Sequence, residues 1–484
     1  METNEQLKQT LMSRAEAGVE QLMVKMQGVE EGDVQELEQL VMVQMLALGR
    51  ACLEQIMEQQ AQETGSAARR QGACGHTQRL VNRRPRQLLT LLGPITIHRA
   101  YYQCLRTDTP AECPAQKACG HGEAPFDAHW SLSGQRSSPG VQKLVSYLAA
   151  TLTHEGVAEA ISRLLPLQMS ARQVGHLMQP VGEAFAQWED QQVEALLQQG
   201  ANPHTSEAEW QERQADPIAR LYVEMDGIMA RLRRGSVPMD KQEQERGGDV
   251  YREVKVGAVF VGHPGPERSE LVPGVFVDTP GPIGYVARRT TADEFAPRLY
   301  ALAHRAGVLR AKQVVILADG AKWIWRLAEE QFPGAVQIVD EYHARQHVWE
   351  VARAAFAADP SQRDAWATAV IEKLADGQIE EVIATLERLP PMAPEPGKSR
   401  SLPEIEADYF RTNAERMRYP AFRAQGMHVG SGIAEAACKT VVSTRAKRAG
   451  MRWTPEGLDA VLALRTAVLN RDFDQCWQAS RGIA

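Results

Sequence analysis

The sequence lacks the features that mark membrane-spanning and secreted proteins. It contains no continuous run of about 18 or more apolar residues, which is the length that a membrane-spanning helix needs. The opening stretch, METNEQLKQT, is polar and acidic, and it lacks the basic and then apolar layout of a signal peptide. We therefore expect a cytoplasmic protein without a membrane segment.

Clean C-x2-C pairs are also missing. The seven cysteines are an odd number in a long chain, which does not suggest a disulfide scaffold. Cysteines nevertheless flank a predicted hairpin, in the stretches ACGH, YYQC and ECPAQKACGH. Because a zinc ribbon pairs two knuckles of metal ligands across a hairpin, this region predicts either a Zn²⁺ site or a ribbon without metal. The candidate ligands are Cys74, His76, Cys104, Cys113, Cys119 and His121.

Acidic residues are absent from two stretches, although the whole chain carries a net charge of −7. Residues 66–106 hold eight arginines and no Asp or Glu, and residues 436–455 hold five Lys or Arg and again no acid. Local charge decides whether a surface attracts phosphate. One such run is often only a solvated surface, but two of them favour binding of a polyanion. The candidate DNA-binding residues are Arg83, Arg84, Arg86, Arg99, Arg172, Lys439, Arg445, Lys447, Arg448, Arg452 and Trp453.

The N-terminal part of this 484-residue chain divides into three predicted regions. Residues 1–63 are predicted to be helical, and residues 66–130 contain the Arg-rich hairpin, with two strands around the turn Gly93-Pro94. We interpret the apolar stripe in residues 34–56 as a packing or dimerisation face. Its members recur at helical spacing and are Leu37, Leu40, Val41, Met45, Leu48 and Cys52.

Residues 137–200 are predicted to be helical, with a short break at residues 166–170. Ser170 is a suitable N-cap for the following helix, which holds Arg172. A helix, a tight turn and a polar second helix fit a helix-turn-helix reader of DNA. Ordinary helical packing explains the same pattern.

From residue 216 the pattern changes to short strands, in IARLYVEMDG, REVKVGAVFVGH, PGVFVD and IGYVARRT. A helix over residues 292–307 follows, and then strand, helix and strand in QVVILADG, AKWIWRLAEEQF and AVQIVDEYHA. This order predicts a mixed α/β sheet with crossover helices over residues 216–343. Residues 344–425 are predicted to be a helical insertion, residues 426–484 a C-terminal helical part of the core, and residues 241–249 a hairpin loop.

Two of these strands are predicted to end in an aspartate that is followed by a glycine, at Asp226-Gly227 and Asp319-Gly320. One such pair alone is most often a turn. Ligands of open α/β sheets bind at strand ends, however, and two aspartates on neighbouring strands can share a divalent cation. Their oxygen atoms suit Mg²⁺ or Mn²⁺. A third acid would complete a site for two ions about 3.5–4 Å apart, which clamp the attacking and leaving oxygens of a phosphodiester.

The third acid that we single out is Glu435, in the stretch GSGIAEAACK. It lies in the first turn of a predicted helix, and Lys439 and further cations follow along the same segment. This layout suits a metal ligand beside a track of DNA phosphates. A carboxylate in a first helical turn also offsets the helix dipole without any metal.

The order Asp226, Asp319, Glu435 resembles the DDE triad of RNase H-like transposases. The stretch VDEYHARQHVWEVA carries Asp340-x2-His343, which is similar to the D-x2-H signature that follows the second catalytic strand in several transposase groups. Five blocks together resemble bacterial insertion-sequence transposases of the ISKra family: MDG, REVKVGAVF, LADGAKWIW, FPGAVQIVDEYHA and GSGIAEAACKTVVSTRAKRAGMRW. The resemblance covers residues 66–478 and includes the Arg-rich hairpin, but that family has cleaner CxxC knuckles than this chain.

The resemblance implies a multidomain α/β protein in which helical and zinc-ribbon-like DNA-binding regions precede an RNase H-like core with a helical insertion. The implied function is a DNA transposase of a bacterial mobile element, which binds terminal inverted repeats and carries out metal-dependent cleavage and strand transfer into target DNA. Asp226 and Asp319 would bridge two Mg²⁺ or Mn²⁺ ions, and Glu435 would complete the second. Assembly around two DNA ends implies a homodimer or higher oligomer, associated with the nucleoid.

Further residues have two interpretations each. His343 would shape the site, with Asp340 orienting its ring, or it is an ordinary half-buried histidine. Trp323, Trp325 and Trp453 would stack on an extruded base, although for Trp323 and Trp325 we favour core packing.

Three other functions compete with this interpretation. A structure-selective nuclease on the same fold would use the same three acids, but it has less need of a large N-terminal arm. A non-catalytic DNA-binding regulator, descended from a transposase, has no need to keep all three. A Mg²⁺-dependent phosphohydrolase with Asp226 as nucleophile would be expected to have a D-x-D pair, whereas Glu224 stands two positions before Asp226.

Overall fold

The structure is a computed structural model that describes residues 2–27, 34–72, 76–104, 122–198, 217–239, 243–244, 247–268, 276–394 and 399–482. The chain forms two compact units, Met1–Met178 and Gln179–Ala484. The boundary between them falls inside the long helix α6 (Ala171–Gln198), and so within the region that the sequence predicted as one helical domain. Within the predicted loop at residues 241–249, residues 241–242 and 245–246 lie outside the described residues.

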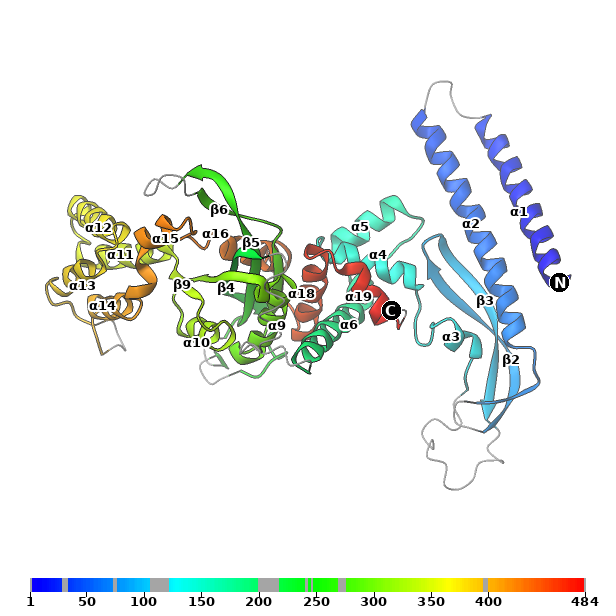
Figure 1. Cartoon of the computed structure of the whole chain (residues 1–484). Coiled ribbons are helices and arrows are strands. Elements are labelled where there is room, and N and C mark those ends of the chain that lie inside the picture. The colour runs from blue at the N-terminus through cyan, green and yellow to red at the C-terminus, as the bar shows by residue number, and fades with distance from the viewer. Residues whose placement is uncertain are drawn as a thin grey trace. The chain divides into compact units, whose positions relative to one another are not determined.

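In the first unit, α1 (Glu2–Met26) and α2 (Val34–Thr64) lie side by side, and a sheet in the order β1-β2-β3 follows (Figure 1). Its strands are antiparallel: β1 (Arg69–Gln71), β2 (Thr77–Thr90) and β3 (Gly93–Cys104). The predicted turn at Gly93-Pro94 is wrong by two residues, because Thr90 pairs with Gly93 and the chain turns at Leu91 and Leu92. Gly93 has a positive φ of 114°, and its carbonyl accepts a 2.7 Å hydrogen bond from the Thr90 hydroxyl. The glycine therefore opens β3 rather than forming the turn.

Helix α2 covers the edge of β3 that faces away from β2. Glu54 Oε1 accepts a 2.7 Å hydrogen bond from Thr96 N–H, and Glu58 Oε2 accepts one of 2.7 Å from His98 N–H. These carboxylates satisfy backbone donors that an open sheet edge would leave unpaired. The side chains of Met57 and Ala61 are buried in the same interface.

The predicted apolar stripe on α2 is partly covered, because Leu37, Leu40, Leu48 and Cys52 are half-buried whereas Val41 and Met45 are exposed. Over the described residues, α2 is also the one helix that is long and apolar enough to cross a membrane by length and composition, and 11% of that apolar window is buried. The sequence argument missed it because polar residues interrupt every apolar run in α2, whereas its average hydropathy is high.

Short helices complete the first unit: α3 (Pro125–His129), α4 (Pro139–Ala149) and α5 (His154–Leu164). A tight connection then leads into α6, and Ser170 caps that helix as predicted. Its hydroxyl accepts a 3.3 Å hydrogen bond from Gln173 N–H, while Gln173 Oε1 accepts a 2.8 Å bond from Ser170 N–H. This reciprocal pair is a capping box, which fixes where α6 begins.

The second unit is built on a mixed six-stranded sheet in the order β6-β5-β4-β8-β9, with β7 paired to β5 (Figure 1). The strands β5, β6 and β7 are antiparallel to their neighbours, whereas β4, β8 and β9 run parallel. The predicted mixed α/β architecture is confirmed in this form. The strands are β4 (Ile218–Leu232), β5 (Val250–Arg268), β6 (Phe276–Pro280), β7 (Gly284–Arg288), β8 (Ala311–Ala318) and β9 (Val336–Val339).

Helices lie on both faces of this sheet. On one face, α9 (Ala292–Arg305) packs so closely on β5 that a Cβ added to Gly257 would lie 2.6 Å from Leu299 Cδ1. On the opposite face, α16 (Gly432–Ala437) and the π-helical segment η4 (Cys438–Ser443) contact β4. The crossover helix α10 (Lys322–Gln331) connects β8 to β9, as the sequence predicted.

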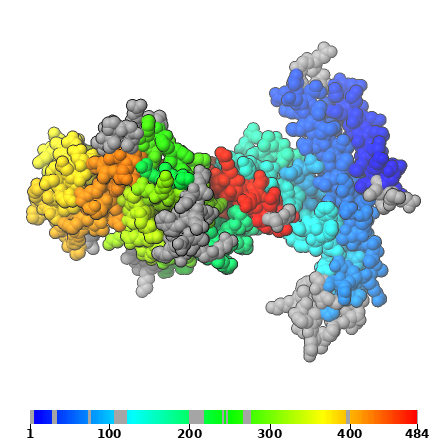
Figure 2. All heavy atoms as spheres, in the orientation of Figure 1, coloured from blue at the N-terminus to red at the C-terminus, as the bar shows by residue number. Residues whose placement is uncertain are grey.

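The region predicted as a helical insertion contains helices, which Figure 2 shows in yellow to orange, packed against the green sheet region. Their bounds are α11 (Glu341–Ala355), α12 (Pro360–Ala375), α13 (Ile379–Glu387), α14 (Leu402–Thr412), η3 (Ala414–Met417) and α15 (Tyr419–Ala424). The chain then continues through α16, η4 and α17 (Thr444–Ala446) to α18 (Pro455–Leu469) and α19 (Phe473–Ser480). One continuous apolar core joins the sheet to the insertion helices.

Candidate active site at the edge between strands β4 and β8

The two aspartates singled out in the sequence lie where the parallel pairing of β4 and β8 ends. The register between β4 and β8 pairs Ile218 with Ala311 and ends at Glu224 with Leu317. Asp226 and Asp319 each follow two residues after this last pair. Adjacent strands lie about 4.8 Å apart, so the two carboxylates start from neighbouring backbone positions.

Asp226 does not end its strand, contrary to the prediction. β4 continues to Leu232 because its antiparallel pairing with β5 extends through Asp226 to Leu232 with Val250. The pairing with β8 stops earlier, because β8 itself ends at Ala318 and Asp319 follows it, as predicted. Asp226 therefore lies on a strand that is supported on one side and open on the other.

Backbone donors hold both carboxylates. Asp226 Oδ1 accepts a 2.6 Å hydrogen bond from Gly227 N–H, and Asp319 Oδ1 accepts one of 2.9 Å from Ala321 N–H. Gly320 has a positive φ of 96°, and the Tyr409 hydroxyl donates a 3.0 Å hydrogen bond to Asp319 O. The Asp-Gly pair thus makes a tight turn as well as presenting a carboxylate.

The electrostatics of Asp226 reflect the proximity of Asp319. Burial raises the pKa of Asp226, the Gly227 hydrogen bond lowers it, and the nearby Asp319 charge raises it again. Two half-buried carboxylates that repel one another are a suitable environment for a cation.

Helix α16, which carries Glu435, and the following segment η4 each make one polar contact with β4. Ala434 N–H donates a 2.7 Å hydrogen bond to Glu224 Oε2, and Cys438 Sγ lies 3.5 Å from Asp226 Oδ2. Glu224 is fully buried, and this burial raises its pKa to about 8. Its second oxygen, Oε1, has no hydrogen-bond partner within the described part of the chain.

Glu435 itself is exposed, although its neighbours Ala434 and Cys438 contact β4. Among the described residues, one group of three or more His, Cys, Asp or Glu side chains has its ligand atoms within 4.8 Å of one another, namely His347, Glu350 and Glu406. Asp226, Asp319 and Glu435 do not form such a group. The structure brings the backbone of Glu435 to the site, but not its carboxylate to coordination distance.

Asp340 accepts hydrogen bonds from backbone N–H groups, including that of His343, whereas the prediction was that it orients the His343 ring. Its Oδ1 caps α11 by accepting hydrogen bonds from Tyr342 N–H at 2.6 Å and His343 N–H at 3.2 Å. Its Oδ2 accepts a 3.0 Å bond from Ser431 N–H and another bond from the Ser431 hydroxyl. Asp340 therefore joins the start of α11 to the residue before α16.

The ring of His343 contacts a second histidine. His343 Nε2 lies 3.2 Å from His347 Nε2, and the other ring nitrogen of His347, Nδ1, lies 2.7 Å from Glu406 Oε2. The His347 ring stacks on Tyr409, with centroids 4.1 Å apart. The charge of His343 also lowers the pKa of Asp226, so this group borders the candidate site.

Several of the predicted DNA-binding arginines have structural roles instead. Arg99 Nε lies 2.7 Å from Asp127 Oδ1, and Arg86 Nη1 lies 2.5 Å from Asp127 Oδ2. Arg86 also donates to the carbonyl oxygens of Leu132 and Gln135. Because a shared carboxylate and backbone carbonyls engage them, these two arginines hold the hairpin to the segment that follows it.

The other hairpin arginines are less enclosed. Arg83 donates weak hydrogen bonds to the carbonyls of Ala61 and His98, both at 3.4 Å. The Arg84 guanidinium lies over the Tyr101 ring, 3.4 Å from its centroid. Both side chains are exposed, as is Arg172 near the start of α6.

The C-terminal basic segment separates into buried and exposed members. Arg445 is fully buried, with its guanidinium 5.0 Å from the centroid of Trp453. Trp453 is also buried and donates a 2.9 Å hydrogen bond from Nε1 to Ala446 O. The structure therefore removes both from the predicted DNA surface. The exposed members are Lys439, Lys447, Arg448 and Arg452, and Arg452 pairs with Asp249 at 3.2 Å.

Trp323 and Trp325 pack against the core of the second unit, which agrees with the interpretation that we favoured. Lys255 Nζ lies 3.9 Å from the Trp323 ring centroid, and Trp325 is buried below the Arg416 guanidinium at 4.6 Å. Of the predicted zinc ligands, Cys74, Cys113, Cys119 and His121 lie outside the described residues. Cys104 is buried at the end of β3 and receives a 3.8 Å contact from Gln78 Nε2.

Sequence reasoning missed Glu224, Cys438, His347 and Glu406. Glu224 had one available signal, since it lies two residues before Asp226 and side chains two apart share a face of a strand. His347 lies four residues after His343 and thus on the same face of a helix. No local pattern connects either histidine with Glu406, which only the packing of α14 brings near.

Comparison with known proteins gives two findings. Residues 303–475 match an uncharacterised protein family, UPF0236, and this match includes Asp319 and Glu435 but not Asp226. Among solved structures, the Drosophila P element transposase strand transfer complex is similar at 11% sequence identity, over 73% of this chain and 83% of that chain. Its TM-score of 0.21 is too low to establish a shared fold. No curated protein matches the chain.

Proposed function

We propose that the protein is a DNA transposase whose sheet is an RNase H-like core, with Asp226, Asp319 and Glu435 as its metal-binding acids. The observation that carries this proposal is the proximity of Asp226 and Asp319, which follow two residues after the last pair of β4 and β8 and whose charges act on one another. The docking of α16 on β4 supports it further, because that contact brings the segment with Glu435 to the same edge. This arrangement agrees with the resemblance of the sequence to DDE transposases.

The donor set fits a hard divalent cation. Asp226 and Asp319 offer carboxylate oxygens from adjacent backbone positions, and Glu435 would complete the set from the first turn of α16. Mg²⁺ or Mn²⁺ in such a site would supply Lewis-acid activation of water and of a 3′-hydroxyl. The chain's own residues would bind and orient: Gly227 N–H and Ala321 N–H fix the two aspartates, and the buried Glu224 holds α16 against β4.

The proposed partner is double-stranded DNA, namely the terminal inverted repeats and the target. The exposed cations Lys439, Lys447 and Arg448 follow Glu435 along the chain, where they would contact phosphates beside the site. The exposed apolar residues of α2 would form a homodimer interface. Light scattering tests this interface, because a monomer both with and without cognate DNA would exclude it.

The exposure of Glu435 favours one second candidate, a DNA-binding regulator without catalysis. Such a protein would bind the same DNA, but it would not need a carboxylate at coordination distance from the two aspartates.

Cleavage of the DNA that flanks the gene separates the two candidates. Purified protein is incubated with these flanks and Mg²⁺ or Mn²⁺, and new 3′ ends are mapped for wild type, Asp319→Ala and the exposed control Asp364→Ala. A transposase gives metal-dependent cuts at inverted repeats that Asp319→Ala loses and Asp364→Ala keeps. Tight binding without cuts, together with an empty metal site in a titration, would establish the regulator.

A further inference from the structure

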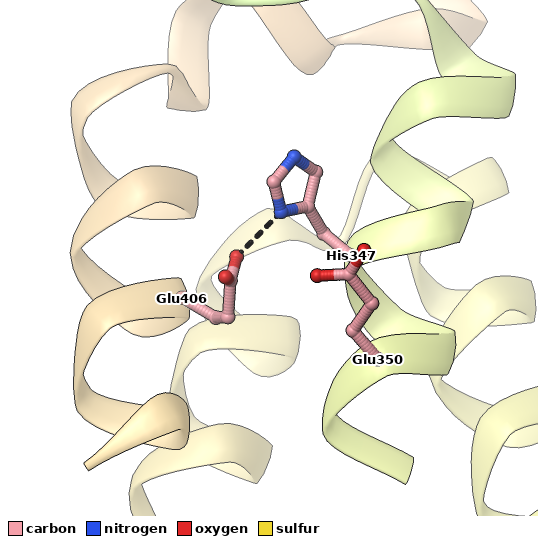
Figure 3. A group of neighbouring side chains, drawn as sticks. All are labelled: His347, Glu350 and Glu406. Atoms are coloured by element: carbon pink, nitrogen blue, oxygen red, sulfur yellow. Dashed lines mark hydrogen bonds and ion pairs between the residues drawn. The ribbon is translucent and has the colours of Figure 1, made fainter. Parts of the chain in front are cut away.

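A second group of metal-ligating side chains lies in the helical insertion, where α11 and α14 pack together. α11 contributes His347 and Glu350, which are three residues apart and therefore neighbours on one helix face. α14 contributes Glu406, whose carboxylate points at the His347 ring (Figure 3). One ligand atom from each of the three lies within 4.8 Å of the other two.

Burial and stacking fix two of these three side chains. Glu406 is only 5% exposed, and a buried carboxylate needs a positive or hydrogen-bonding partner. Its Oε2 lies 2.7 Å from His347 Nδ1. The His347 ring is held parallel to Tyr409, at 23° and 4.1 Å between centroids, so its nitrogen stays directed at Glu406. Glu350 is exposed and leaves a path for an ion from solvent.

The donor set selects the class of ion. One imidazole nitrogen with two carboxylates is a mixed nitrogen and oxygen set, which suits Zn²⁺ and related transition metals, whereas Mg²⁺ and Ca²⁺ prefer oxygen alone. Three protein ligands also leave one tetrahedral position open, as is common at zinc sites that keep a water. We propose that His347, Glu350 and Glu406 bind a Zn²⁺-class divalent ion that bridges α11 and α14.

The surroundings of His347 supply the outer partner that metal-bound histidines usually have. An ion at Nδ1 would replace the hydrogen bond between Nδ1 and Glu406 Oε2, and the ring proton would then reside on Nε2, which lies 3.2 Å from His343 Nε2 and would donate to it. His343 then accepts that bond with its own proton on Nδ1. The three ligands are different residues from the three acids of the proposed transposase, although the two groups border one another, so the proposal does not require those acids to be catalytic.

Zinc binding to the full-length protein tests the proposal. Metal-free protein is titrated with Zn²⁺ against a chromophoric chelator, in a background carrying Asp226→Asn and Asp319→Asn so that the candidate active site contributes nothing. We expect His347→Asn and Glu406→Gln each to remove one bound ion per chain. The exposed Glu350→Gln should weaken that ion about tenfold or more, and Glu372→Gln, an exposed control on α12, should leave it unchanged.

All variants contain the same N-terminal cysteines. Any Zn²⁺ that these cysteines bind therefore cancels when the number of bound ions is compared between variants. Circular dichroism checks that each variant folds. If His347→Asn or Glu406→Gln does not fold, Glu350→Gln still decides the matter, because its side chain is exposed. Equal affinity and stoichiometry in wild type and Glu350→Gln would overturn the proposal. Loss of DNA cleavage has no bearing on this result, so the site can be correct where the transposase proposal fails, and the reverse.

Discussion

Asp226, within β4, and Asp319, directly after β8, each lie two residues beyond the last bonded pair of the two strands, Glu224 and Leu317, and the Asp319 charge adds to burial in raising the pKa of Asp226. Beyond that pair the strands behave differently, because β4 continues along β5 while β8 gives way to the turn at Gly320. The divergence leaves an edge at which both carboxylates are half-buried. An anionic substrate can approach such an edge only if cations neutralise it.

Stability should report metal binding at this edge independently of catalysis. Without divalent ions, the repulsion between Asp226 and Asp319 opposes folding, so Asp226→Asn should raise the melting temperature of metal-free protein. Mg²⁺ should raise the melting temperature of wild type by several degrees and that of Asp226→Asn much less, because ligand binding to the native state stabilises it. Differential scanning calorimetry with and without Mg²⁺ measures both effects.

The exposed Asp364→Asn provides the control for this measurement. If Mg²⁺ stabilised Asp226→Asn as strongly as wild type, Asp226 would not bind the ion.

Replacing Gly320 by alanine should destabilise the protein more than the same change at Gly334, which also has a positive φ. The φ of 96° at Gly320 costs an alanine about 1–2 kcal/mol, and an added Cβ would lie 2.7 Å from the Tyr409 hydroxyl. Gly334 has a φ of 78° but nothing within 4 Å of an added Cβ. Urea unfolding should therefore show Gly320→Ala to be more destabilised than Gly334→Ala. Equal losses would mean that Tyr409 moves aside freely and does not fix the turn after Asp319.

We expect Glu224 to stabilise the fold as a hydrogen-bond acceptor and not through a negative charge. Glu224→Gln keeps an acceptor for Ala434 N–H and should fold with little loss of stability. Glu224→Leu leaves that buried N–H unpaired and should cost about 1–3 kcal/mol. Chemical denaturation compares the two variants. If both lost the same stability, the contact between α16 and β4 would not depend on this hydrogen bond.

The sequence predicted the strands and the crossover helices well because each has a local pattern. Asp319 was placed correctly at the end of β8, since an apolar run followed by Asp-Gly fixes that boundary. Asp226 has the same local pattern, yet β4 continues for six more residues, to Leu232. The difference arises from pairing with β5, which is distant in sequence and leaves no trace around Asp226.

For the basic residues too, contacts with residues distant in sequence decide what the sequence pattern cannot. Charge patterns identified Arg86, Arg99 and Arg445 as one class with Lys447, because all lie in stretches without acids. The structure separates them by partners outside those stretches: Asp127 engages Arg86 and Arg99. Arg445 is enclosed beside Trp453, which no count of charges along the chain reveals. Burial, and not composition, decides which cation is available to a phosphate.

This division gives a test of the DNA surface. Lys447 is exposed, so Lys447→Ala should weaken DNA binding and reduce the slope of log affinity against log salt by about 1, with an unchanged unfolding midpoint. Arg445→Ala should instead lower the unfolding midpoint, because it removes a large buried side chain from beside Trp453. Binding to the flanking DNA at several salt concentrations, with unfolding of the same samples, measures both. A reduced salt slope in folded Arg445→Ala would show that this arginine leaves its buried position to contact DNA. An unchanged slope in Lys447→Ala would mean that the DNA phosphates do not contact the segment that follows Glu435.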